Sequence, residues 1–149
     1  MWMIPTPFTT FIGELTSLPQ SEVQAMENEP SVGAFAIVPS NNLQASVSFW
    51  ERLGFARSGG ESTYIIMSGW DCEVHLTQAG QNEWRVPEHN PFGVFIRTPD
   101  VEAIAARVED LIIRPGGVLR HREWGIYEVG IAGPDNLLVR IGWPSKLIR

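Results

Sequence analysis

The amino-acid sequence predicts an α+β fold in which a strand, a helix and three further strands form one module (βαβββ) that occurs twice. The first observation is that strand and helix patterns follow in this order within residues 33–78. The second is that the same order returns within residues 91–144, about 60 residues further on. A duplicated unit of this type builds two half-barrels around one shared cleft. We therefore expect the functional site in such a cleft.

The first module begins with an apolar run at residues 33–38, which predicts a buried strand. A helix with an apolar stripe at helical spacing follows it. The side-chain oxygen of Asn41 or Asn42 can cap its start, and Gly54 can end it in the left-handed conformation that a helix terminus favours. Trp50 belongs to the stripe, so we expect it in the core.

Three short strand patterns complete the first module, at residues 55–58, 62–68 and 71–77. Gly59-Gly60 and Gly69-Trp70 separate them and supply the turns of a meander. This order predicts that the three strands pair in sequence.

The last of these strands carries the first candidate site. Apolar residues alternate along it with Glu73 and His75, so one face packs on the helix while the other carries ionisable groups. Glu73 and His75 could hold a ligand cation, form a hydrogen-bonded pair or lie at a rim. Tyr64 also alternates with apolar neighbours, and it could face the cleft or pack in the core.

The second module repeats the pattern. Residues 92–98 read as a strand, Asp100 as a helix cap, and residues 115–117 (Pro-Gly-Gly) as the segment that closes the helix. A turn at residues 133–136 precedes the last strand. The three strands after the helix are predicted at residues 118–122, 126–131 and 137–143.

Arg140 is the second candidate, because its neighbours Val139 and Ile141 must face the opposite side of the last strand. Arg140 then points into the cleft, where a guanidinium needs an acceptor. Glu73 or Glu128 could supply one in an internal ion pair, or Arg140 could clamp a carboxylate of a ligand.

Composition sets further bounds. A chain of 149 residues with 44% apolar composition suits one domain, which we place at residues 31–149 behind an extension at residues 1–30 with a short helix at 21–26. The net charge of −6 disfavours nucleic acid and favours a cationic or neutral ligand. Cys72 is the only cysteine, which excludes an internal disulfide.

Membrane and secretory signals do not stand out. No apolar run approaches the roughly 18 residues that a membrane-spanning helix needs. The first 20 residues lack a basic leading segment and a continuous apolar stretch. We therefore expect no membrane partner and a cytoplasmic location.

Two segments resemble signatures of one superfamily. The first is LQASVSFWERLGF, and the second is EWGIYEVGIAGPDNLLVRIGW. Together they are similar to the superfamily of glyoxalase I, extradiol dioxygenases, fosfomycin-resistance enzymes and bleomycin-resistance proteins, the vicinal oxygen chelate superfamily. Gly133 stands where an Asp is usual, and the Gly that follows the second Asp is absent. The turn retains Pro134 and Asn136, so we expect the last strand to survive both departures.

The resemblance also has a bearing on metal binding. Metal-dependent members take His, Gln or Glu ligands from the first and last strands of each module. Here the first strands offer Phe35 and Phe92, and Arg140 falls where those enzymes have a carboxylate. Only Glu73 or His75 remains, whereas a stable site needs three or four ligands. We therefore expect no metal and no cofactor.

The bleomycin-resistance branch is the closest in pattern. Its members bind a bulky cationic antibiotic without a metal and form intimate dimers with ligand grooves at the subunit boundary. Trp124 falls at the position of a groove-lining tryptophan, with core or interface packing as the alternative. The resemblance implies a homodimer that binds a small molecule and confers antibiotic resistance. The ligand-binding residues that we expect are Trp124, Tyr64, Glu73, His75, Arg140 and Glu128.

Two other functions stay open. One is a superfamily enzyme of lyase, isomerase or dioxygenase type that acts on an unidentified small substrate. The other is a module that serves only in protein association and whose cleft is filled by its own side chains.

Overall fold

A computed structural model describes residues 32–79 and 83–149. The chain divides into two units after Ala34, and the unit that begins at Phe35 holds both predicted modules. The extension predicted at residues 1–30 and the short helix predicted within it lie outside the described residues.

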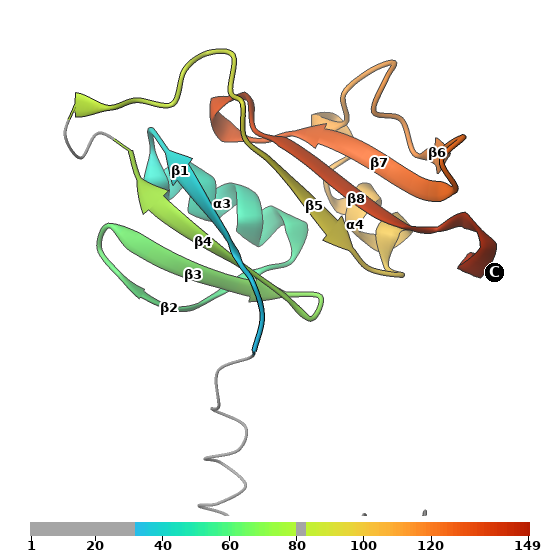
Figure 1. The fold of residues 1–149 in the computed structure, drawn as a ribbon, viewed down its shortest axis with the longest axis horizontal. Coiled ribbons are helices and arrows are strands. Elements are labelled where there is room, and N and C mark those ends of the chain that lie inside the picture. Colours follow the sequence, from blue (N-terminus) through green and yellow to red (C-terminus); the bar gives the residue numbers. More distant parts are fainter. Residues whose placement is uncertain (1–31, 80–82) are drawn as a thin grey trace, which may run out of the picture. The chain divides into compact units, whose positions relative to one another are not determined.

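The first module forms a four-stranded sheet in the order β1-β4-β3-β2 (Figure 1). The strands β1 and β4 run parallel, whereas β4, β3 and β2 form an antiparallel meander. Its elements are β1 (Ala36–Ser40), α3 (Leu43–Leu53), β2 (Ala56–Glu61), β3 (Tyr64–Gly69) and β4 (Cys72–Gln78).

The second module repeats this topology as the sheet β5-β8-β7-β6. Its first and last strands again run parallel and its last three are antiparallel. The prediction of an α+β fold with two βαβββ modules is therefore confirmed. The elements are β5 (Gly93–Arg97), α4 (Val101–Arg107), β6 (Arg120–His121), β7 (Ile126–Ala132) and β8 (Leu138–Pro144), with short 3-10 turns η2 (Glu109–Leu111), η3 (Pro134–Asn136) and η4 (Ser145–Leu147).

Helix α3 begins and ends where its cap residues predict. The Asn42 side chain accepts a hydrogen bond from the backbone N–H of Ala45 at 3.0 Å. Gly54 adopts the left-handed conformation (φ 102°), and its N–H bonds back to the last turn. Trp50 is 1% exposed, as the apolar stripe predicts.

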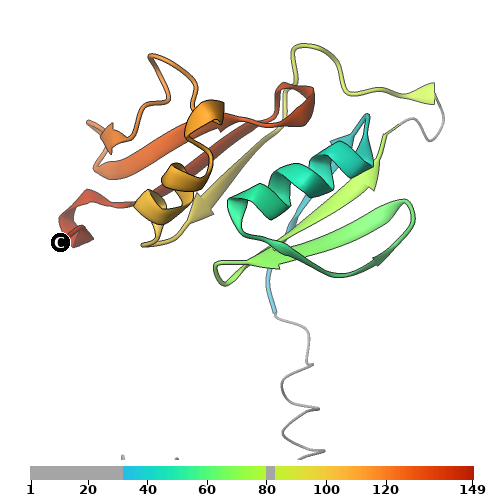
Figure 2. The same ribbon diagram turned by 180° about the vertical axis from the view of Figure 1, so that it is seen from behind.

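Each helix covers one face of its own sheet, and Figure 2 shows both helices on the same side. One cluster of buried apolar residues extends through both modules, and α3 contacts α4 and η3. No helix of the described residues covers the opposite face of either sheet. That open face is where the alternation of residues predicts the candidate site. None of the described helices has the length and apolar character to cross a membrane.

The predicted turn at Gly59-Gly60 is wrong. Both glycines belong to β2, where the pairing with β3 shifts register between Arg57 and Gly59, and the turn falls at Ser62-Thr63. Gly60 has a φ of 90°, and a Cβ there would overlap the carbonyl oxygen of Tyr64. The glycine pair therefore lies inside a strand, directly after its register shift, rather than in a turn between strands.

Asp100 precedes α4 as predicted but does not cap it with its side chain. Its carboxylate accepts from the hydroxyl of Thr98 at 3.3 Å instead. The helix also ends well before residues 115–117, where the sequence predicts its close, because Val108 leaves the helical conformation (φ −131°). Strand β6 has only two residues where five are predicted.

The turn before β8 ties the two modules together. Asp135 and Asn136 both have positive φ values, 58° and 56°, a conformation that Asp and Asn tolerate better than most residues. The Asp135 carboxylate accepts from the backbone N–H of Asn41 at 2.9 Å. Strand β8 survives the missing glycine, as predicted, because Asn136 takes the conformation that a glycine would supply.

Candidate functional site

The six candidate residues form two clusters, one on the open face of each sheet. Tyr64, Glu73 and His75 lie on β3 and β4, opposite a face whose side chains are buried against α3. Trp124, Glu128 and Arg140 lie on or beside β7 and β8. Hydrogen bonds and ion pairs join the members within each cluster. That both clusters line one shared cleft stays a prediction, because the grooves described below are lined by the second module alone.

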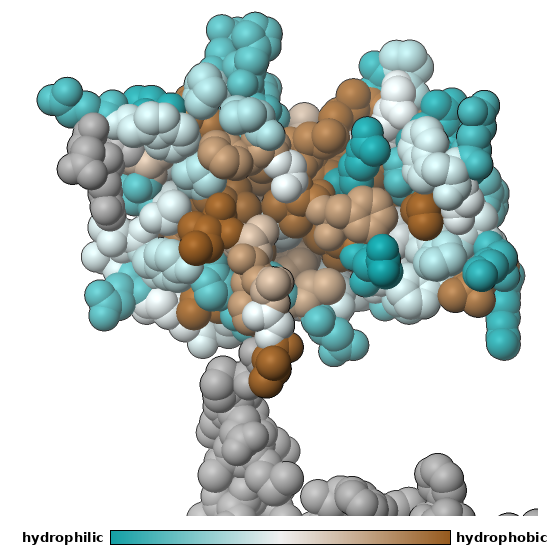
Figure 3. All heavy atoms as spheres, in the orientation of Figure 1, coloured by the Kyte–Doolittle hydropathy of each residue, from teal (hydrophilic) through white to brown (hydrophobic). Residues whose placement is uncertain are grey.

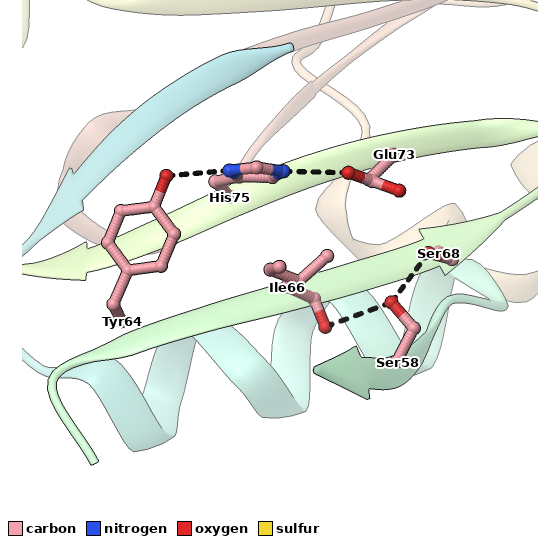
Figure 4. A network of polar contacts seen from close by, with 6 residues as sticks. All are labelled: Ser58, Tyr64, Ile66, Ser68, Glu73 and His75. Carbon is pink, nitrogen blue, oxygen red and sulfur yellow. Dashed lines mark hydrogen bonds and ion pairs between the residues drawn. The ribbon is translucent and has the colours of Figure 1, made fainter. Parts of the chain in front are cut away.

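In the first cluster, His75 bridges Tyr64 and Glu73 (Figure 4). The Tyr64 hydroxyl lies 2.6 Å from Nδ1 of His75, and Nε2 lies 2.7 Å from Oε1 of Glu73. An ionised carboxylate only accepts hydrogen bonds, so Nε2 of a neutral His75 carries the proton and donates to Glu73. Nδ1 then accepts from the Tyr64 hydroxyl. This chain of hydroxyl, imidazole and carboxylate is the order in which proteins arrange a base and the group that orients it.

Apolar groups surround this chain of hydrogen bonds. The ring of Phe35 stacks on His75 with centroids 5.5 Å apart and planes inclined by 12°. Ile37 of β1 is the cross-strand partner of His75 and is 58% exposed. The side chains of His75 and Glu73 are only 17% and 23% exposed. The network is therefore partly shielded from water, which strengthens its hydrogen bonds.

The residues of this cluster do not fit a metal ion. Both imidazole nitrogens of His75 already have partners, and Phe35 covers the ring. Among residues 32–79 and 83–149, no three His, Cys, Asp or Glu side chains lie close enough together to hold an ion. Cys72 lies next to Glu73, and burial, followed by the charge of Asp71, raises the pKa of its thiol.

The second cluster centres on Glu128, which is 3% exposed although it lies on the open face of sheet β5-β8-β7-β6. Its Oε1 lies 3.6 Å from Nε of Arg122 and 3.9 Å from Nη1 of Arg140. Its Oε2 accepts a long hydrogen bond, 3.4 Å, from the indole N–H of Trp124. One buried carboxylate thus serves two guanidinium groups and an indole.

A groove of about 270 Å³ opens over this cluster. Three glycines, Gly116, Gly117 and Gly130, give it a floor without side chains. The remaining lining residues are Ile113, Arg122, Trp124, Glu128, Leu138 and Arg140. The groove therefore combines an aromatic ring, charged groups and apolar surface, which is the usual make-up of a small-molecule site.

Trp124 is 61% exposed, so it does not pack in the core. The guanidinium carbon of Arg122 lies 6.0 Å from the centre of its ring. Arg140 points away from the buried Val139 and Ile141, as its position in the strand predicts, and its side chain is 48% exposed. Of the acceptors considered for Arg140, Glu128 is the one nearby.

Arg122 was not predicted from the sequence. It follows Arg120, the cross-strand partner of Glu128, by two residues, so strand alternation could have placed it on the same face. Phe95 was missed as well. It is the cross-strand partner of Arg140 and is 45% exposed.

A second groove, of about 460 Å³, lies between α4 and the C-terminal segment, where Trp143, Leu147 and Arg149 contribute to its wall. At this groove the Tyr127 hydroxyl donates to Oε1 of Glu102 at 2.9 Å. Burial, and then the hydrogen bond to Glu102, raises the pKa of Tyr127. None of the six candidate residues lines this groove.

Comparison with known proteins places the fold. No family model matches the chain, and no curated protein matches its sequence. Among solved structures, a bleomycin-binding protein complexed with bleomycin superimposes with a TM-score of 0.63 at 18% identity, covering 76% of this chain and 98% of that one. A bleomycin resistance determinant encoded on the transposon Tn5 gives 0.63 at 19% identity, with 76% and 98% covered.

An enzyme has the same fold. A lactoylglutathione lyase from Agrobacterium tumefaciens superimposes with a TM-score of 0.58 at 15% identity, covering 80% of this chain and 98% of that one. The two modules, their strand order and these structural neighbours agree with the two sequence signatures. The chain has the fold of the glyoxalase/bleomycin resistance (vicinal oxygen chelate) superfamily.

Proposed function

We propose that the chain is a metal-free small-molecule-binding protein whose ligand packs against Trp124 in the groove over Glu128. The observation that carries the proposal is that Trp124, which is 61% exposed, lines a groove together with charged groups. Large aromatic side chains usually bury most of their surface. A flat ligand would cover this ring and gain the area that the chain leaves open.

Bleomycin-type antibiotics are the specific ligands that we propose, since two of the structural neighbours are a bleomycin-binding protein and a bleomycin resistance determinant. A cationic part of such a ligand would find its carboxylate at Glu73, which is 23% exposed and has His75 as its neighbour. The function in the cell would then be antibiotic resistance by sequestration.

Calorimetric titration with bleomycin, metal-free and copper-loaded, tests this proposal. We expect Trp124→Ala to weaken binding by about tenfold or more, because the ligand loses its stacking partner. Trp84→Ala is the matched control, because Trp84 is 47% exposed but does not line the groove. Absence of heat at high micromolar bleomycin, or equal effects of the two variants, would contradict the drug-binding proposal.

The alternative is an enzyme of the same superfamily, and the chain of Tyr64, His75 and Glu73 is the observation that favours it. A histidine between a hydroxyl and a carboxylate can take a proton from the first while the second stabilises the resulting cation. Since one neighbour is a lactoylglutathione lyase, S-lactoylglutathione is the first substrate to try. Turnover by the wild-type chain that His75→Asn abolishes would support the enzyme. Equal rates for the wild-type chain and the variant would contradict a catalytic role of His75 and favour the binding function.

A further inference from the structure

The groove over Glu128 has a local charge opposite in sign to that of the whole chain. Its lining contains two guanidinium groups, those of Arg122 and Arg140, and one carboxylate, that of Glu128. Two positive charges and one negative charge leave the groove with a net charge of +1, whereas the chain carries −6. A groove of this sign attracts an anion and repels a cation.

The carboxylate of Glu128 mainly compensates the buried charge of Arg122. Both side chains are buried, with 7% exposure for Arg122 and 4% for Glu128, and a buried charge needs a partner more than an exposed one does. Among the described residues Nε of Arg122 is buried without a hydrogen-bond partner, and Nη2 donates to the carbonyl of Val118 at 3.1 Å. Glu128 therefore lies closer to the more deeply buried of its two cations, Arg122, than to the half-exposed Arg140.

Arg140 is the arginine of the groove whose N–H groups stay available to a ligand. Its Nη1 lies 3.9 Å from Glu128, which is beyond hydrogen-bonding distance, and in residues 32–79 and 83–149 its guanidinium makes no hydrogen bond. The side chain is 48% exposed and lines the groove. Its planar set of donors matches the two oxygens of a carboxylate.

The rest of the groove suits a ring attached to that carboxylate. Trp124 lines the groove and is 61% exposed, and Leu138 and Ile113 add apolar surface to its lining. The space above Gly116 is open, since an added Cβ there would meet no atom within 4 Å. A volume of about 270 Å³ lies below the roughly 300–1,000 Å³ typical of drug-sized ligands, which indicates a molecule of one or two rings.

We infer that this groove binds aromatic carboxylic acids, with Arg140 clamping the carboxylate and Trp124 packing on the ring. The inference rests on the proposed small-molecule function and deepens it, because it assigns an acidic group, rather than a cationic one, to the part of the ligand that enters the groove. Arg122 and Glu128 form the buried support that holds the site together.

The test compares 2-naphthoate with 2-naphthamide, which has the same ring and no charge. Calorimetry measures the affinities, and the indole N–H resonance of Trp124 in an NMR titration reports the place of binding. We expect 2-naphthoate to bind at least tenfold more tightly than 2-naphthamide, and Arg140→Gln to abolish that preference. Arg85→Gln, which removes an equal charge from an exposed position outside the groove, should leave it unchanged. Added salt should weaken the binding of 2-naphthoate and not that of 2-naphthamide.

Each outcome decides a separate point. Equal affinities of the two probes, or an Arg140→Gln variant that keeps the preference, would overturn the acid site even where the Trp124 signal shifts and small-molecule binding stands. A preference for 2-naphthoate that Arg85→Gln also removes would show a long-range charge effect and would overturn it too. Binding of bleomycin without a preference for 2-naphthoate would leave the proposed function in place and remove this inference. Preferential binding of 2-naphthoate by a chain that does not bind bleomycin would support this inference and contradict the proposal that bleomycin is the ligand.

Discussion

Tyr127 shows how one side chain links stability to pH. Burial and the hydrogen bond to Glu102 raise its pKa above the ordinary value of 10.0. Below pH 10 the phenol is protonated in both the folded and the unfolded chain, so it adds no pH dependence. As pH rises past 10, the unfolded chain releases its proton first, and the free energy of unfolding falls until the folded phenol also ionises.

We therefore predict that the stability contributed by Tyr127 is fully present below pH 10 and is lost as pH rises through its folded pKa. Urea denaturation at pH 8 and at pH 10.5 measures the loss. Tyr127→Phe keeps the ring and removes the ionisation, so its stability should fall less over this range. Equal falls in the two proteins would mean that the phenol is not perturbed.

The alternation of side chains along a strand predicts some parts of the candidate site and not others. The period of two in β4 and β8 places Glu73, His75 and Arg140 on the open faces, as the structure confirms. Alternation does not give distances between residues that are far apart in sequence. The stacking of Phe35, which directly precedes β1, on His75 of β4 and the cross-strand position of Phe95 opposite Arg140 depend on parallel strand pairings. The register of those pairings cannot be read from the sequence.

At the scale of elements, predictions held where a local interaction decided the outcome. Asn42 and Gly54 define the ends of α3 through hydrogen bonds within a few residues, so the sequence predicts the helix closely. Asp100 failed as a side-chain cap because Thr98 competes for the same carboxylate. The predicted turn at Gly59-Gly60 is wrong because glycines also occur next to irregularities within strands, and only the pairing with β3 distinguishes the two cases.

The backbone conformation of Gly60 in β2 gives a prediction about stability. Its φ of 90° is unfavourable for any other residue, and a Cβ would run into the backbone of Tyr64. We expect Gly60→Ala to lower the free energy of unfolding by about 1–3 kcal/mol or more. Gly116→Ala is the matched control, because its Cβ would meet nothing within 4 Å and its φ is not positive. Urea denaturation of the two variants checks the difference, and equal stabilities would mean that the backbone at position 60 accommodates a Cβ without strain.

At the scale of the whole molecule, the open faces of both sheets carry more than the two candidate clusters. Figure 3 shows hydrophobic side chains gathered in the middle of the face that Figure 1 presents. Ile37 on β1, Phe95 on β5 and Leu138 on β8 are 58%, 45% and 37% exposed. Exposed apolar residues gathered on one face usually mark a surface that a partner covers. The sequence could not show this patch, because it combines strands of two modules.

We predict that a second copy of this chain covers the patch, as the resemblance to bleomycin-resistance proteins implies. Sedimentation equilibrium should give twice the chain mass of 16.6 kDa at micromolar concentration. Ile37→Asp should shift the equilibrium to the monomer, because a carboxylate in the centre of the interface loses its water. Leu147→Asp changes a residue that is similarly exposed, 52%, but lies in η4, and it should leave the mass unchanged. A mass of 16.6 kDa for the wild-type chain at every concentration would mean that the patch faces water or a ligand rather than a second subunit.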